Sequence, residues 1–321
     1  MNYFLRKIIL FIILLLFALF CIEKILFSKK IYPIITNSVS FDVKSYFARD
    51  CEIDKVDILA FGSSMTLNNL NSQVFLSSLN NKFTFLNLSS WGIQLNEIDY
   101  LMKFYLKKYD PKLVILVSSI VDFDKPSVIT LPGYFEYDIF YKKYFDLLYI
   151  FKNPQIDKLY YRAKDVNLYK YYSQNKYENL EFDKFGGVIL DIPVENIEAG
   201  RWNMEFRAPR EEHISSLQDL SDYLMREKVK LIFVQSPIKK DYYKDKESKI
   251  ILQSFFDETK KIIENNNNIY INLHDENIYQ DSLFCDVFHL NKTAAEFMTK
   301  DIIKKINIDS LLESGNLNKN Y

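Results

Sequence analysis

The sequence predicts a three-layer α/β sandwich built on a parallel sheet. Apolar stretches of strand length recur along the chain, and between them apolar residues follow helical spacing. The expected strands are 56–61, 83–89, 112–119, 229–235 and 268–273. The expected helices include 96–108, 213–228 and 250–264. Because the strands are apolar throughout and alternate with helices, both faces of the sheet should be covered.

Composition limits the class of protein. With 321 residues, 48% of them hydrophobic, the chain can bury a sizeable core. Its net charge is -1, so no global field attracts nucleic acid and no nucleic-acid partner is expected. No metal-ligand spacing or phosphate loop occurs, and no cofactor is expected. Free thiols are expected, because Cys51 and Cys285 are predicted at opposite ends of the first strand.

Residues 1–28 are predicted to form a signal anchor, that is, a retained transmembrane helix. Arg6 and Lys7 precede an uninterrupted apolar run from Ile8 to Ile22, and the span reaches Phe27 if charged side chains snorkel. A cleaved signal peptide is the competing interpretation, but no small-x-small cleavage site follows the run. A short tail ahead of a long chain favours a cell-membrane protein with an extracytoplasmic domain.

The remaining chain divides into a linker, a domain and a tail. Residues 29–55 are expected to form a juxtamembrane linker with one or two short elements, residues 56–305 the α/β domain, and residues 306–321 a flexible tail. The strand–helix alternation fails over about 127–206, which is rich in tyrosine. This insertion is either a lid with aromatic surface for sugar rings or a set of tyrosine-packed helices. The second interpretation is slightly favoured, because aromatic residues at helical spacing more often fill cores.

The first expected strand ends in Gly62, Ser63 and Ser64. In open parallel sheets, sites form outside the carboxyl ends of the strands. Ser64 would begin the next helix, where backbone amides and the helix dipole stabilise a developing oxyanion. A serine in this position is more often only an N-cap. The segment by itself therefore leaves capping and catalysis both open.

A second candidate group lies near the other end of the chain. Asp286 and His289 are three residues apart and precede the last helical stretch. A histidine near its usual pKa of about 6.5 can take a proton from serine, and an acid can hold the other ring nitrogen. The other two histidines, His213 and His274, are expected to be capping or surface groups. His289 is therefore the expected general base and Asp286 the residue that orients it.

The ordered set of motifs resembles the SGNH/GDSL hydrolase superfamily of esterases and acyltransferases over roughly residues 56–305. Gly62-Ser63-Ser64 matches the first block, with Ser64 at the nucleophile position. Gly92 matches the oxyanion donor of the second block, and Asp286 and His289 match the fifth block. The resemblance implies a Ser-His-Asp triad formed by Ser64, His289 and Asp286.

The third block departs from the family pattern of Gly-x-Asn-Asp. Ser119 to Asp122 occupy it, and Val121 stands where the family has the asparagine that donates to the oxyanion. Losing one such donor commonly lowers the rate about 100- to 1000-fold. Asn68, Asn69 and Asn87 are candidate replacements, and the sequence does not choose among them.

The GSS block, the absent asparagine and the anchor together resemble the membrane-anchored branch with the D-alanine transfer proteins of teichoic acid modification. This resemblance implies a serine esterase or O-acyltransferase acting on a cell-envelope polysaccharide. The implied partners are an acylated or acceptor glycan, the membrane and a membrane-bound O-acyltransferase. The alternative is a non-catalytic glycan-binding or assembly-accessory protein of the same fold, motivated by the absent asparagine.

Overall fold

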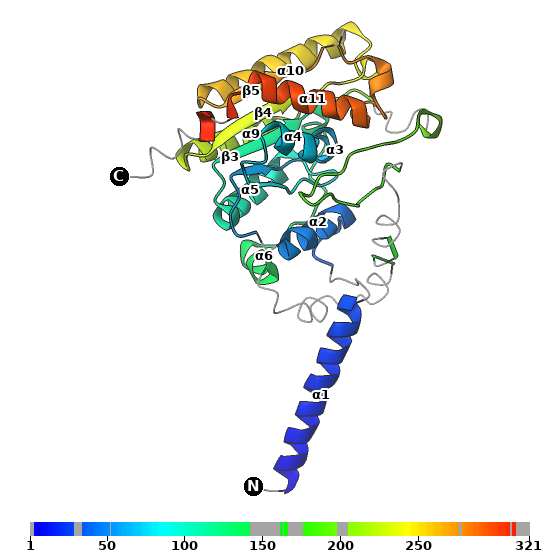
Figure 1. The fold of residues 1–321 in the computed structure, drawn as a ribbon, viewed down its shortest axis with the longest axis vertical. Helices are drawn as coiled ribbons and strands as arrows, with labels where there is room; N and C mark the ends of the chain where they lie inside the picture. Colours follow the sequence, from blue (N-terminus) through cyan, green and yellow to red (C-terminus); the bar gives the residue numbers. More distant parts are fainter. Residues whose placement is uncertain are drawn as a thin grey trace.

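A five-stranded parallel sheet lies at the centre of the protein (Figure 1). The computed structural model describes residues 3–28, 34–51, 53–141, 161–162, 164–165, 176–197, 205–275, 278–308 and 310–312. The strand order is β2-β1-β3-β4-β5, and every neighbouring pair is parallel. The strands are β1 (Ile58–Ala60), β2 (Phe85–Asn87), β3 (Leu113–Ser118), β4 (Lys230–Gln235) and β5 (Ile269–Asn272). The predicted α/β fold with a parallel sheet is confirmed.

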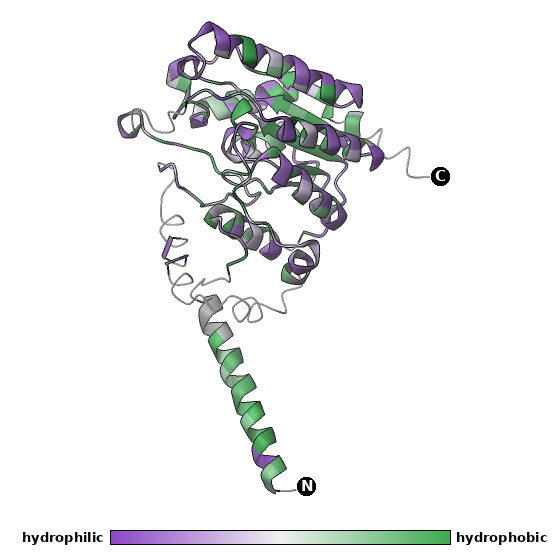
Figure 2. Cartoon of the chain, turned by 180° about the vertical axis from the view of Figure 1, so that it is seen from behind, coloured by the Kyte–Doolittle hydropathy of each residue, from purple (hydrophilic) through white to green (hydrophobic). Residues whose placement is uncertain are grey.

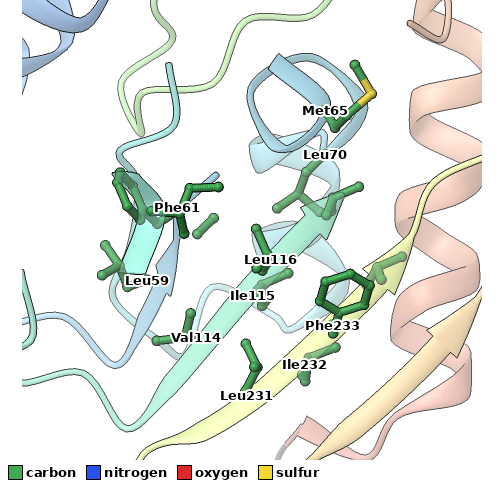
Figure 3. Close-up of a cluster of buried hydrophobic side chains, with 14 of the residues drawn as sticks. Leu59, Phe61, Met65, Leu70, Val114, Ile115, Leu116, Leu231, Ile232 and Phe233 are labelled. Atoms are coloured by element: carbon green, nitrogen blue, oxygen red, sulfur yellow. The ribbon is translucent and has the colours of Figure 1, made fainter. Parts of the chain in front are cut away.

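The central strands are apolar because both of their faces are covered. Every residue of β3 is buried, as is every residue of β4 after Lys230. The two strands pair in register from Leu113 opposite Lys230 to Ser118 opposite Gln235. Figure 3 shows their apolar side chains packed beside those of β1 and beneath Met65. Removing such side chains from water is the main force that holds the layers together.

Helices form the two outer layers (Figure 1). One group packs side by side and consists of α5 (Leu95–Tyr109), α9 (Glu211–Arg226) and α10 (Lys246–Asn265). In the other group, α11 (Lys292–Lys305) packs against α3 (Ser64–Asn69) and α4 (Ser72–Ser78). The short 3₁₀ turns are η1 (Ile120–Asp122), η2 (Val194–Asn196), η3 (Lys240–Tyr242) and η4 (Asp281–Leu283).

Helix α1 (Tyr3–Ser28) carries an uninterrupted apolar run from Ile8 to Ile22, and Figure 2 shows one hydrophilic band near its N-terminus. Its stretch Tyr3–Ile22 has 20 residues and is long and apolar enough to cross a membrane, with none of it buried in the protein. At 1.5 Å per residue this stretch spans about 30 Å, the thickness of a bilayer core. A signal sequence meets the same criteria of length and composition.

Helix α2 (Val39–Asp50) lies within the stretch expected to be a linker and packs closely onto the domain. Ser38 caps its first turn by accepting from the Phe41 amide. Asp42 is buried and accepts hydrogen bonds from the Thr36 amide at 2.8 Å and from the Thr36 hydroxyl at 2.7 Å. Burial raises the pKa of Asp42 to about 7, against the opposing effect of Arg162.

Two sequence expectations concern segments at the edges of the domain. Of the tyrosine-rich insertion, the structure describes 127–141, which includes α6 (Tyr134–Tyr141), then 161–162, 164–165, 176–197 and 205–206. Its stretches 142–160, 166–175 and 198–204 and residue 163 lie outside the described residues. The flexible tail expected from residue 306 needs correction, because the side chains of Ile306, Ile308 and Leu312 are buried in the core. Their apolar character explains this packing, and residues 313–321 lie outside the described part.

Candidate active site

A pocket of about 300 Å³ opens at the carboxyl edge of the sheet. In the order 2-1-3-4-5 the connections diverge between β1 and β3, and this switch point leaves a crevice above the strand ends. Five parts of the chain line the pocket. They contribute Ser64, Met65 and Asn68 after β1; Trp91, Gly92 and Gln94 after β2; Val121, Asp122, Lys125, Pro126 and Val128 after β3; Tyr177, Glu178 and Leu190; and Phe288 and His289.

The two serines after β1 have different roles. Ser63 is buried and is the N-cap of α3, where its Oγ accepts from the Met65 amide at 3.1 Å. Ser64 is the first residue of the helix, is only partly buried, and lines the pocket. The sequence left capping and catalysis both open for this segment. In the structure Ser63 is the cap, and Ser64 is the serine that lines the pocket.

Asp286 holds His289 through both backbone and side chain. Asp286 Oδ1 accepts from the His289 amide at 2.8 Å, and Oδ2 lies 2.7 Å from His289 Nδ1. Burial raises the pKa of Asp286, but the charge of His289 and the hydrogen bonds from it outweigh burial, and the pKa is lowered overall. A carboxylate on Nδ1 fixes the tautomer that leaves Nε2 as a proton acceptor.

His289 and Ser64 line the same pocket, as the sequence predicts. Within the described part of the chain no hydrogen bond joins Ser64 Oγ to the His289 ring, and the only partner of that ring is Asp286. Catalytic hydrogen bonds are often long in unliganded sites and tighten when substrate binds.

Helix α3 also positions the segment that carries His289. The Asn69 side chain donates from Nδ2 to the Phe288 carbonyl at 3.1 Å and accepts the Leu290 amide on Oδ1 at 2.9 Å. These two bonds fix the backbone on either side of His289. Asn69 Nδ2 also donates to Ser236 Oγ at 2.9 Å, so the helix is tied to the end of β4 as well.

Two glycines shape the loops beside Ser64. A Cβ at Gly62 would lie 2.4 Å from Thr66 Oγ1, so only glycine permits this close approach of the loop to α3. Gly92 has φ +71°, a left-handed conformation that glycine adopts at little cost. The Ser90 amide donates to the Gly62 carbonyl at 3.0 Å. The second loop therefore runs directly beside the loop of the candidate nucleophile.

The third predicted block occupies η1, after β3. Val121 lines the pocket, so an apolar side chain stands where the resembled family has an amide donor. Asp122 lies beside it, and its Oδ2 accepts from Ser118 Oγ at 2.7 Å. Ser63 gives Asp122 a further side-chain hydrogen bond, which links the end of β3 to the cap of α3.

The predicted asparagine candidates are separated by the structure. Asn68 lines the pocket, but its Nδ2 donates to the Val188 carbonyl at 3.0 Å. Asn87 is fully buried and lies outside the pocket lining. Its Nδ2 donates to the Thr66 carbonyl at 3.2 Å and its Oδ1 accepts from the Ser89 amide. The predicted role of Asn87 in the site is therefore wrong, because its side-chain amide binds the Thr66 carbonyl and joins β2 to α3.

The other two histidines lie away from the pocket lining. His213 was expected at a cap or on the surface, but it is fully buried and its Nε2 lies 2.6 Å from the Lys125 carbonyl. Burial lowers its pKa. His274 is half-buried, and its Nδ1 accepts the Ile238 amide at 3.2 Å. Among the described residues, no group of three or more His, Cys, Asp and Glu side chains is placed to hold a metal ion.

Several pocket residues carry no sequence signal of their own. Gln94 precedes a predicted helix, but it is not among the residues predicted for the site. Tyr177, Glu178 and Leu190 come from the return of the insertion, whose position cannot be derived from periodicity. A position shortly after the end of β2 is the sequence feature that could have suggested Gln94, whereas Asp122 stands in the third block already named from the sequence.

No protein-family model matches the chain, and no curated protein matches it. Among solved structures, a Bacteroides fragilis protein assigned as an acylhydrolase has a TM-score of 0.46 at 11% identity, covering 84% of this chain and 98% of its own. A variant of a Geobacillus acetyl-xylooligosaccharide esterase has a TM-score of 0.42 at 11% identity, covering 79% and 95%. A GDSL-like lipase from Bacteroides thetaiotaomicron has a TM-score of 0.39 at 9% identity, covering 83% and 98%.

Proposed function

We propose that this protein is a membrane-anchored serine esterase or O-acyltransferase of the SGNH type that acts on a cell-envelope polysaccharide. One observation carries the proposal: Ser64 and the Asp286-bound His289 line one pocket although they come from opposite ends of the domain. Such convergence at a strand-end crevice is typical of an active site built for a nucleophile and a base.

In the proposed reaction, Ser64 Oγ attacks the carbonyl carbon of an acyl ester while its proton passes to His289 Nε2. The resulting oxyanion accepts hydrogen bonds from the amides of Ser64 and Gly92. Collapse breaks the bond to the leaving alcohol, which takes the proton from His289. A sugar hydroxyl or water then attacks the acyl-serine ester while His289 takes its proton, and His289 returns a proton to Ser64 Oγ as the bond from Oγ to the acyl carbon breaks. Asp286 holds the imidazole throughout.

The lining of the pocket supports an acylated or acceptor glycan as the ligand. Trp91 and Tyr177 offer aromatic surface on which a sugar ring can stack, while Met65, Val128 and Leu190 suit the apolar part of an acyl group. Transfer to the sugar is favoured over hydrolysis if the occupied pocket excludes water. Held at the membrane by α1, the domain would receive acyl groups from a membrane-bound O-acyltransferase.

A fluorophosphonate probe on the detergent-solubilised full chain tests the proposal. We expect the wild type to be labelled and Ser64→Ala to lose labelling, because the probe reacts only with an activated serine. Ser78→Ala is the matched control, since Ser78 is an exposed serine of α4 outside the pocket. Labelling that persists in Ser64→Ala would contradict the assignment of the nucleophile.

The second candidate function is a non-catalytic glycan-binding or assembly-accessory protein. The observation that favours it is Val121 in the pocket, where the resembled hydrolases place an oxyanion donor. A folded wild type that resists the probe yet binds an envelope oligosaccharide would establish this alternative.

A further inference from the structure

The loop after β2, which carries the Gly92 amide, is held by two different parts of the fold. The Leu88 amide donates to the Ala60 carbonyl at 2.9 Å, and the Ser90 amide donates to the Gly62 carbonyl at 3.0 Å. The end of β1 and the loop after it therefore hold the first half of the β2 loop. The second half is held by α2, the first helix after α1 in the chain.

Ser40, in the first turn of α2, makes the contact with the second half of the loop. Its Oγ accepts a hydrogen bond from the Trp91 amide at 3.1 Å and another from Ser90 Oγ at 3.0 Å. Ser40 is 2% exposed and Ser90 is fully buried, so water does not compete for these bonds. A hydroxyl oxygen has two lone pairs, and here two consecutive residues of one loop use both.

Gly92 lies between two fixed points of the backbone. On one side Ser40 holds the Trp91 amide, and on the other side the Gln94 amide donates to Glu97 Oε2 at 2.8 Å. Gly92 has φ +71°, and a Cβ built on it would meet no atom within 4 Å. Because the space on this side of Gly92 is open, the flanking hydrogen bonds set the direction of its amide.

Other residues of α2 hold the helix against the same loop. Lys44 is 1% exposed, and its Nζ donates to the Asn87 carbonyl at 3.2 Å and to the Gly186 carbonyl. Val43 is buried in a small apolar cluster against which the Trp91 side chain packs. Helix α2 therefore contacts the chain where β2 ends and again just before Gly92.

We propose that Ser40 is a positioning residue for the oxyanion hole of the proposed reaction. By holding the Trp91 amide, it directs the Gly92 amide toward the oxyanion that forms when Ser64 Oγ attacks the acyl carbon. A donor stabilises an oxyanion best when it is fixed before the reaction begins. The segment expected from the sequence to be a linker thus supports the active site. The inference rests on the proposed acyl chemistry at Ser64.

Steady-state hydrolysis of p-nitrophenyl acetate by the detergent-solubilised full chain tests the role. We expect Ser40→Ala to lower kcat about 10- to 100-fold with KM nearly unchanged, because a misdirected Gly92 amide weakens binding of the transition state only. Ser40→Thr keeps the hydroxyl and should recover most of the rate.

Ser45→Ala is the matched control. Ser45 is also a fully buried serine of α2, but its Oγ lies 2.9 Å from the Tyr137 hydroxyl of α6 and not beside the β2 loop. Its loss removes a buried hydrogen bond from the same helix. We expect the midpoint of thermal unfolding to fall in both alanine variants, but kcat to fall only in Ser40→Ala.

Two further measurements separate positioning from a general loss of structure. An alkyl trifluoromethyl ketone bonds through its carbonyl carbon to Ser64 Oγ, the serine proton passes to His289, and the carbonyl oxygen becomes an oxyanion. We expect Ser40→Ala to weaken this inhibitor by the same factor as it lowers kcat/KM. The pH dependence of kcat/KM should match that of wild type, because the contact between Asp286 and His289 is unchanged.

The outcomes distinguish failure of this inference from failure of the proposed function. Wild type that is neither labelled by the fluorophosphonate nor active refutes the proposed function itself, whatever Ser40 does. With an active wild type, an unchanged kcat in Ser40→Ala refutes the role of Ser40 alone. An equal loss of kcat in Ser45→Ala, or a raised KM with unchanged kcat in Ser40→Ala, also refutes it. If Ser40→Ala does not fold, Ser40→Cys supplies the test, because a thiol fills the same space as a weaker acceptor.

Discussion

At the scale of single residues, a buried carboxyl group, that of Asp122, stands in the pocket lining. Asp122 lines the pocket and is almost fully buried, with hydrogen bonds from Ser63, Ser118 and Ser119. Burial raises its pKa from 3.8 to about 6, and the hydrogen bonds oppose that rise only in part. The nearby charge of Asp124 raises it further. This carboxyl therefore takes up a proton more readily in the folded protein than in the unfolded chain.

Because the pKa of Asp122 is raised in the folded protein, its contribution to the free energy of unfolding depends on pH. Between pH 3.8 and about 6 the native state binds more protons than the unfolded state, so the contribution of Asp122 to stability rises as pH falls through this window. We expect Asp122→Asn to gain stability over wild type at pH 7.5, on the order of 2–3 kcal/mol. This advantage should shrink by pH 4.5.

Urea unfolding of wild type and Asp122→Asn across this range checks the expectation. Other acidic groups, such as Asp42, titrate in both proteins and cancel in the difference. A difference in unfolding free energy that does not vary with pH would show that the Asp122 carboxyl is not perturbed.

At the scale of elements, the six-residue helix α3 holds both halves of the proposed site. Its first residue, Ser64, faces the pocket, and its last residue, Asn69, holds the backbone on both sides of His289. Thr66 ties the helix to β3, donating to the Val117 carbonyl at 2.7 Å and accepting the Val117 amide at 2.9 Å. The relative position of the proposed nucleophile and base thus depends on one short element.

Removing the Asn69 amide should affect rate and stability together. In Asn69→Ala the Leu290 amide and the Phe288 carbonyl lose buried partners, which costs about 1–3 kcal/mol. The loosened segment displaces His289, and we expect kcat to fall about 100-fold. Asn71→Ala is the matched control, because the Asn71 side chain caps α4 through the Val74 amide, and among the described residues it has no hydrogen bond to the segment that carries His289. The control should lose stability of about 1 kcal/mol with kcat retained.

Esterase assays and urea unfolding of both variants measure these two effects separately. If Asn69→Ala unfolds more easily but keeps the wild-type kcat, the amide supports the fold without positioning His289.

At the scale of the whole molecule, an apolar helix and a folded domain occupy one chain. Helix α1 exposes apolar side chains between Tyr3 and Ile22, while the domain places its apolar residues inside and polar ones on the outer helices (Figure 2). The proposed anchor would keep the pocket near a membrane surface, where both acyl donors and envelope glycans are found.

Charges in the middle of α1 test the proposed anchoring in the intact chain. Arginine near the centre of a membrane-spanning helix costs about 3 kcal/mol per residue, so we expect Ile12→Arg with Ile13→Arg to release the protein from the membrane fraction. Phe4→Arg, beside Arg6 at the helix end, should remain bound because an end charge can snorkel. Alkaline extraction followed by sedimentation measures the distribution. Equal retention of all three proteins would argue against α1 as the anchor.

Local patterns in the sequence determined the layers, the parallel sheet and the main chemical candidates. Apolar runs and helical spacing are local properties, so they predict β3, β4, α5 and α10 with small shifts at the ends. The pairing of Asp286 with His289 could also be predicted from the sequence, because they stand three positions apart and a short turn brings them together.

Only the tertiary structure decided which polar groups remain available for chemistry. It assigned capping to Ser63 and the pocket to Ser64, and it buried the amide of Asn87 between β2 and α3. The physical reason is that a side chain's partners come from segments distant in sequence. Periodicity places an element in a layer, but it does not state which loop lies across from it.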